Sequence, residues 1–124
     1  MNSAPPYLAT VVEHYRRPHN QRSIAAATHV HEGVNTICGD RMRIELEVRG
    51  AAVVDVAFAA SACAIATASA SLLTDRIRGQ QLAEVERLRD DDVIAALGDG
   101  VPAARHACAT LPLRILRGAL ANGT

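Results

Sequence analysis

The sequence predicts a single α+β domain over residues 1–124, in which a three-stranded antiparallel sheet packs against about four to five helices. Three observations predict this fold. Apolar and polar residues alternate through residues 41–48 and 53–58, a tight turn at Arg49-Gly50 joins these two runs, and helical spacing dominates before and after them. A chain of 124 residues can bury a core of this kind without disulfide bonds.

The strands follow from periodicity of two. Residues 41–48 place four apolar side chains on one face and charged side chains on the other, so this strand is expected to have one buried face; the apolar set is Met42, Ile44, Leu46 and Val48. In the next strand, Val54, Val56 and Phe58 are expected to share the buried face. A weaker alternation over residues 30–36 adds the first strand of the meander.

The helices follow from spacings of three and four residues. They are expected at residues 7–17, 64–78, 82–88 and 91–97, with a last helix that begins near residues 108–111. Pro112 sets that beginning, because proline is tolerated best within the first turn of a helix. Small residues fill the first half of the 64–78 helix, which indicates close packing against it. Residues 20–28 show no clear period and are interpreted as a connector.

Composition excludes several classes of function. Thirteen acidic residues balance thirteen basic ones, so the chain has no charge excess suited to nucleic acid or to an anionic membrane. All the basic residues are arginine, and a chain without lysine cannot form a Schiff base on a lysine side chain. No signal-peptide pattern and no apolar run of about 18 residues occurs, so we expect a cytoplasmic protein with reduced thiols.

Three single cysteines carry the chemical signal. Cys38 lies in a turn between strands, Cys63 lies where the sheet gives way to a helix, and Cys108 lies at the beginning of the last helix. Helix N-termini favour thiolate over thiol. With Asp40, these residues supply four ligands, enough for tetrahedral Zn²⁺ or Fe²⁺. The alternative is that the cysteines are small buried apolar residues. The absence of a C-x-x-C pair argues against a purely structural zinc domain.

Four segments resemble one known family. They are HYRRPHN (14–20), NTICGDRMRIELEV (35–48), CAIATASASLLTDRIRG (63–79) and RHACATLPLRILRGAL (105–120). In this order they are similar to the signature segments of the U-type iron–sulfur scaffold proteins IscU, SufU and the N-terminal part of NifU. The resemblance implies that Cys38, Asp40, Cys63 and Cys108 bind zinc or hold a transient [2Fe–2S] cluster. It also implies persulfide delivery by a cysteine desulfurase, with Cys38 or alternatively Cys108 as the acceptor, and transfer of the cluster to acceptor apoproteins.

Departures from the family pattern leave two functions open. Ala107 stands where IscU proteins have a histidine, whereas Arg105-x-x-Cys108 resembles SufU of the SUF system, although the usual SufU insertion is missing. The chain is therefore expected to be a cluster assembly scaffold rather than an enzyme. The alternative is a zinc-dependent sulfurtransferase that passes persulfide to a separate scaffold. A monomer or a weak dimer fits either function.

The other polar residues receive mostly structural interpretations. His106 is considered as an alternative fourth ligand or a proton relay, or else as a solvated residue at the helix beginning. The acidic run at residues 89–92 is interpreted as the first turn of a helix, and Asp55 and Asp75 as exposed. Ser69 and Ser71 have no activating base nearby in sequence, which argues against a serine nucleophile. The Arg41/Arg43 face is expected to be solvated, with docking of a partner as the alternative. The remaining histidines are expected to be structural or on the surface: His14, His19, His29 and His31.

Overall fold

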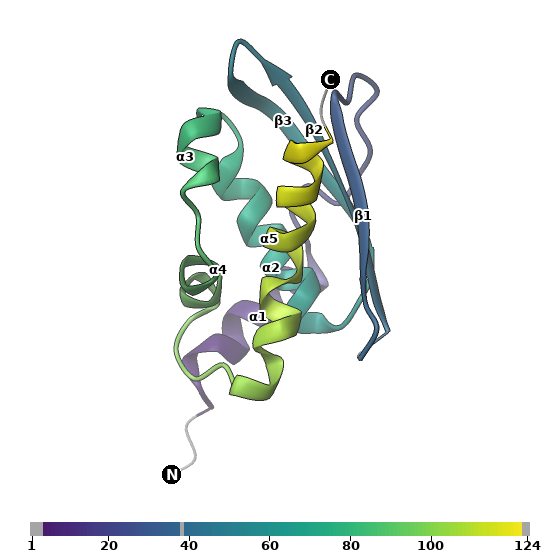
Figure 1. Cartoon of the computed structure of the whole chain (residues 1–124). Coiled ribbons are helices and arrows are strands. Elements are labelled where there is room, and N and C mark those ends of the chain that lie inside the picture. The colour runs from purple at the N-terminus through teal and green to yellow at the C-terminus, as the bar shows by residue number, and fades with distance from the viewer. Residues whose placement is uncertain (1–3, 38, 123–124) are drawn as a thin grey trace.

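The chain folds into two layers, a small sheet and a set of helices that covers one of its faces (Figure 1). A computed structural model describes residues 4–37 and 39–122. The elements, in chain order, are α1 (Pro6–Arg16), β1 (His29–Asn35), β2 (Asp40–Arg49), β3 (Ala52–Ser61), α2 (Ala64–Ile77), α3 (Leu82–Glu86), α4 (Asp90–Leu97), the short 3₁₀-helix η1 (Ala103–Arg105) and α5 (His106–Ala121). The predicted α+β fold, with an antiparallel sheet of order β1-β2-β3, is confirmed. None of the helices in the described part of the chain is long and apolar enough to cross a bilayer.

The central strand β2 is buried on more than the one face that its alternation predicts. Met42, Ile44 and Leu46 are fully buried beneath the helices, as expected. Glu45 points to the other face, yet only 8% of its surface is exposed, because the connector (residues 20–28) crosses that face. Ile24 N donates to Glu45 Oε1 at 3.0 Å, and Arg43 Nε donates to Oε2 at 2.9 Å. The buried carboxylate is therefore hydrogen-bonded at both oxygens.

The predicted face assignment in β3 is wrong at Val54. Its side chain is 43% exposed, whereas Val53 is fully buried. The pairing register explains the change: Asp55 pairs with Glu47, but the next residue of β2, Val48, pairs with Val53. Val54 is the extra residue of a β-bulge, and such a residue reverses the alternation of its strand. The bulge keeps Val53 on the core face.

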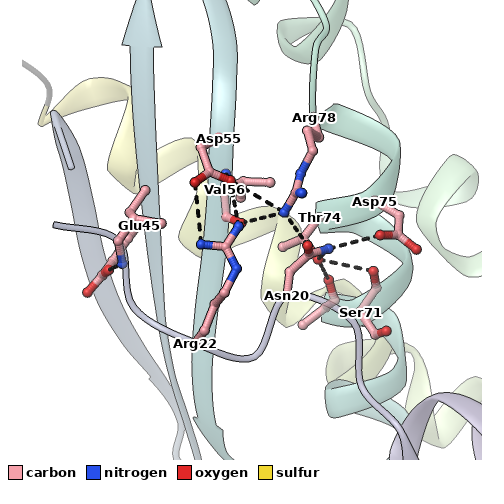
Figure 2. Close-up of polar contacts among 11 residues, drawn as sticks. Asn20, Arg22, Glu45, Asp55, Val56, Ser71, Thr74, Asp75 and Arg78 are labelled. Carbon is pink, nitrogen blue, oxygen red and sulfur yellow. Dashed lines mark hydrogen bonds and ion pairs between the residues drawn. The ribbon is translucent and has the colours of Figure 1, made fainter. Parts of the chain in front are cut away.

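Hydrogen bonds and ion pairs fasten the connector to β3 and α2 (Figure 2). Arg22 Nη2 contacts Asp55 Oδ1 at 2.6 Å, and Arg78 contacts the same oxygen at 3.4 Å. Arg78 also donates to Asn20 Oδ1, while Asn20 Nδ2 donates to Asp75 at 2.9 Å. The Arg22 hydrogen bond outweighs burial and holds the pKa of Asp55 below its usual value. Asp75 is exposed, as expected, whereas Asp55 is only half-exposed, and both carboxylates anchor the connector.

Helix α2 is the centre of the helical layer. Its small residues allow α1, α4, α5 and β3 to pack around it, which confirms the close packing predicted from the sequence. Ala66, Ala68 and Ala70 are all fully buried. The side of α2 that a periodicity argument would leave in water is instead covered by the neighbouring helices.

Helix α5 begins earlier than Pro112 predicts. The helix begins at His106, directly after η1, so Pro112 lies in its second turn rather than its first. Proline has no N–H to donate to the carbonyl of Cys108 four residues earlier, and the missing bond together with ring crowding costs about 3 kcal/mol. The flanking Leu111 and Leu113 are both buried against the sheet and neighbouring helices, and this burial offsets the cost. Tertiary packing thus overrides the local rule for proline.

Candidate metal centre

Three of the predicted ligands converge although they come from three separate elements. Asp40 is the first residue of β2, Cys63 is the N-cap of α2, and Cys108 lies in the first turn of α5. One ligand atom from each, a carboxylate oxygen and two Sγ atoms, all lie within 4.8 Å of one another. In Figure 1 the beginnings of these three elements lie toward the same end of the molecule. The fourth predicted ligand, Cys38, lies outside the described residues.

The two oxygens of Asp40 have different environments. The side chain is 3% exposed, and Oδ1 accepts a hydrogen bond from the backbone N–H of Cys63 at 2.8 Å. Oδ2 is buried and has no hydrogen-bond partner among the described residues. A buried acceptor without a partner costs about 1–3 kcal/mol, so such groups need an explanation. A metal ion beside Oδ2 would supply the missing partner.

The two described cysteines differ in exposure. Cys63 is half-buried, and its Sγ accepts from Ala66 N at 3.4 Å, as the N-cap of a helix does. Cys108 is fully buried within the main core. The expectation that each lies at the beginning of a helix is confirmed, with Cys108 now two residues inside α5.

The turn that precedes Asp40 is shaped by two residues. Gly39 has φ of +71°, a left-handed conformation that glycine adopts without the strain that a side chain would add, and the sequence predicts such a bend where Gly39 separates two predicted ligands. Asn35 closes the preceding strand, and its Oδ1 accepts from Ile37 N at 3.2 Å. Its Nδ2, like Asp40 Oδ2, is buried without a partner among the described residues. Sequence reasoning missed Asn35, although an asparagine two residues before a turn amide is a recognised turn signal.

The donor set and its spacing fit a single tetrahedral ion. Bonds of about 2.0–2.3 Å place neighbouring ligand atoms of a tetrahedron about 3.3–3.8 Å apart. The three described donors lie within 4.8 Å, so small side-chain movements bring them to such an ion. Two thiolates and one carboxylate are ligands that Zn²⁺ and Fe²⁺ accept. The site therefore fits the metal that the sequence predicts, while binding itself stays a prediction.

His106 is placed outside this group of donors. Its Nε2 donates to the carbonyl of Val101 at 3.2 Å, and within the described ranges the cluster of possible ligands contains only Asp40, Cys63 and Cys108. The hydrogen bond to Val101 ties the beginning of α5 to the loop before it. In this conformation the ring is a structural group rather than a fourth ligand.

One serine of α2, Ser71, has an imidazole nearby in space, although no base lies near it in sequence. His14 Nδ1 lies 2.7 Å from Ser71 Oγ, although 57 residues separate them in sequence. Burial, helped by the neighbouring His19, lowers the pKa of His14. Ser71 is nevertheless fully buried, and Ser69 donates its hydroxyl proton to the Ala109 carbonyl at 2.6 Å. A serine nucleophile stays excluded, because no substrate reaches either hydroxyl.

The acidic run at residues 89–92 is structural, as predicted. Asp90, Asp91 and Asp92 form the first turn of α4, where carboxylates interact favourably with the helix dipole. Asp92 Oδ2 also accepts from the backbone N–H of Arg89 at 2.9 Å. These carboxylates cap a helix and are not a second metal site.

The fold and the donor set define a small α+β domain in which one carboxylate and two thiols, candidate ligands of a metal, converge at one end. The chain belongs to the family of NifU-like N-terminal domains, which matches residues 6–122. The family resemblance stated from the four sequence segments is thereby confirmed.

Individual proteins of this family are similar to the chain in sequence or in fold. The chain is 32% identical over 116 residues to the iron–sulfur cluster assembly scaffold protein IscU 1 of Archaeoglobus fulgidus, which covers 94% of this chain and 75% of the relative. It is 33% identical over 76 residues to the zinc-dependent sulfurtransferase SufU of Bacillus subtilis, covering 61% and 51% of the two chains. The fold is similar to that of a NifU-like N-terminal protein from Brucella abortus, with a TM-score of 0.78 at 19% identity and coverage of 94% and 93%.

Proposed function

We propose that this chain is an iron–sulfur cluster assembly scaffold that builds a [2Fe–2S] cluster on Cys38, Asp40, Cys63 and Cys108 and passes it to acceptor apoproteins. The observation that carries the proposal is the convergence of Asp40, Cys63 and Cys108 within 4.8 Å, with a buried carboxylate oxygen that lacks a partner among the described residues. The similarity to proteins named as IscU scaffolds supports it. Sulfur would come from a cysteine desulfurase, and a cytoplasmic location would keep the thiols reduced.

The placement of the donors suits a cargo that must leave again. The three described donors come from three different elements, so a movement of β2, α2 or α5 against the others changes the donor spacing. A structural zinc site built from two C-x-x-C pairs has fewer independent elements and less of this freedom. Asp40 adds a harder and weaker ligand for iron than thiolate, which makes one corner of the site easier to displace.

A second candidate is a zinc-dependent sulfurtransferase. The donors are close enough for one ion, and the similarity to a protein named as a zinc-dependent sulfurtransferase favours this function. Zinc held by Asp40, Cys63 and Cys108 would stabilise the thiolates in a defined geometry. Cys38, or alternatively Cys108, would then accept the persulfide.

One anaerobic experiment separates the two functions. The purified chain is incubated with ferrous iron, cysteine and a cysteine desulfurase, and visible absorption is recorded. A scaffold develops cluster absorption, which Cys63→Ser and Cys108→Ser abolish, whereas Ser61→Ala, an exposed position at the end of β3, leaves it unchanged. A sulfurtransferase develops no cluster but keeps zinc and accelerates desulfurase turnover. Full metal content in both cysteine variants would contradict the assignment of the site.

A further inference from the structure

A hollow of about 340 Å³ opens beside Cys63, between α1 and the segment that leads into α5. Its apolar wall includes Tyr7, Leu8 and Val11 of α1, and Arg105 stands at the end of η1 on the other side. A volume of this size lies within the range of small-molecule binding sites, which begins at about 300 Å³.

Among the three described donors, Cys63 is the one that a small molecule can reach. Its side chain is half-buried and lines the hollow, whereas Asp40 is 3% exposed and Cys108 is fully buried. A reactant in the hollow therefore meets the sulfur of Cys63 before it meets the other two donors. The hollow is an approach to the metal centre from the side of α1.

Arg105 supplies an uncompensated positive charge to this hollow. Its side chain is exposed, and its guanidinium makes no hydrogen bond or ion pair with any described residue. By contrast, Arg22, Arg43 and Arg78 all pair with carboxylates. A guanidinium binds a carboxylate well, and the apolar wall suits a short alkyl chain. The hollow thus offers complementary groups for a small molecule that carries both a carboxylate and a reactive sulfur.

We propose that this hollow binds small carboxylate-bearing persulfides, such as the persulfide of cysteine or of a short cysteine peptide, and that Cys63 accepts their outer sulfur. The proposal rests on the proposed function, because it supplies sulfur to the same site. The Cys63 thiolate attacks the outer sulfur of the donor and forms a new S–S bond. The S–S bond of the donor breaks, and the donor leaves as a thiolate with the electron pair. One persulfide replaces another, so no external oxidant or reductant is needed.

The test compares two matched donors on the full chain. One is glutathione persulfide, and the other is the same compound with its carboxylates esterified. Sulfur gain at Cys63 is followed by mass spectrometry of the digested chain. The parent protein is expected to react faster with the free acid than with the ester. The rate of Arg105→Gln with the free acid is expected to be about fivefold lower than that of the parent, as the loss of an exposed ion pair would give. Arg87→Gln is the control, because Arg87 is an exposed arginine next to α3 that does not line the hollow.

Binding is also measured without sulfur transfer. S-methylglutathione cannot donate sulfur, and its binding, followed by NMR chemical shifts at Ile65 and Tyr7, is expected to weaken in Arg105→Gln alone. Equal rates for the two arginine variants, or first labelling of Cys38 or Cys108, would overturn the proposal. Zinc content and cluster absorption of the parent are recorded separately. Failure of the scaffold function would appear there, while labelling of Cys63 would persist.

Discussion

Asp40 Oδ1 accepts a hydrogen bond from the backbone N–H of Cys63 at 2.8 Å, so the first residue of β2 is fastened to the N-cap of α2. This bond holds two predicted metal ligands in register even without a metal. It also leaves the second oxygen, Oδ2, buried without a hydrogen-bond partner among the described residues. One carboxylate thus serves the fold with one oxygen and is available to a metal with the other.

Substitutions at Asp40 are expected to separate these two roles. Asp40→Asn keeps an acceptor for Cys63 N but removes the charged ligand, so zinc affinity should fall by at least about tenfold while the metal-free fold stays intact. Asp40→Ala removes both oxygens and should in addition lower the free energy of unfolding by about 1 kcal/mol. Chelator competition measures the affinity, and urea unfolding of the metal-free protein measures the stability. Zinc affinity equal to the parent in Asp40→Asn would leave Asp40 with a structural role alone.

The stability of the fold is expected to decrease below pH 6.5 because of His14. Burial and the neighbouring His19 lower the pKa of His14 in the folded protein, whereas the unfolded chain keeps the ordinary value of 6.5. As the pH falls through 6.5, the unfolded state takes up the proton first and is stabilised relative to the folded state. The loss continues until the pH passes the lowered pKa of the folded state. His14→Gln should remove this part of the pH dependence in urea unfolding measured between pH 5 and pH 7.5.

Two carboxylates, those of Glu45 and Asp75, affect the stability of the fold at a lower pH than His14 does. Hydrogen bonds outweigh burial and hold the pKa values of Glu45 and Asp75 below their ordinary values of 4.5 and 3.8. Their stabilisation is present above these values and is lost at more acidic pH. A slope between pH 5 and pH 6.5 that is equal in the parent and in His14→Gln would contradict the role given to His14.

Local patterns in the sequence predicted most of the fold. Alternation in residues 41–48 correctly predicted that Met42, Ile44 and Leu46 of β2 are buried. Pro18 and Gly50 correctly predicted the end of α1 and the turn between β2 and β3. Patterns of this kind depend on neighbours in the chain, which is why they are readable from sequence. Where packing between distant elements decides the outcome, they failed. The local patterns predicted neither the β-bulge at Val54 nor the position of Pro112 in the second turn of α5.

The sequence predicted where the candidate ligands lie along the chain, at the boundaries of strands and helices, but it did not predict their arrangement in space. Each described cysteine lies at a helix beginning as predicted, but the convergence of Asp40, Cys63 and Cys108 was inferred from ligand type and from the family resemblance, because no spacing in the sequence predicts it. The contact between His14 and Ser71 had no sequence signal, because it joins residues 57 positions apart. Burial of the second oxygen of Asp40 follows from the packing of three elements, which no local rule describes.

Removing Asp55 is expected to destabilise the fold more than an exposed ion pair would. Asp55 contacts two guanidiniums, those of Arg22 and Arg78, and its Oδ1 also accepts from Val56 N at 2.9 Å. Asp55→Ala should lower the free energy of unfolding by about 1–2 kcal/mol, a value discounted for partial exposure. Arg87→Gln breaks an exposed pair with Glu84 and should change it by less than about 0.5 kcal/mol. Similar losses in both variants would show that the connector does not depend on Asp55.

Gly118 of α5 lies against His31 of β1, so the effect of Gly118→Ala on the free energy of unfolding is expected to depend on whether the His31 ring is present. A Cβ at Gly118 would lie 2.6 Å from His31 Nε2 and 2.8 Å from Cγ, and the ring is held by Asn122, whose Nδ2 donates to Nδ1 at 3.1 Å. Alanine is favoured over glycine within a helix by about 1 kcal/mol. Overpacking costs about 1–3 kcal/mol, so Gly118→Ala should be destabilising in the parent chain.

Removing the ring isolates the steric effect. In a His31→Ala background the added methyl group meets no imidazole, so Gly118→Ala should stabilise the protein by up to about 1 kcal/mol through helix propensity. Urea unfolding of both single variants and of the double variant gives the interaction between the two positions. If Gly118→Ala stabilises the parent chain as well, the ring moves aside freely, and the close approach of α5 to β1 does not depend on this glycine. The expected reversal would instead show that Gly118 sets the distance at which α5, and with it Cys108, packs against the sheet.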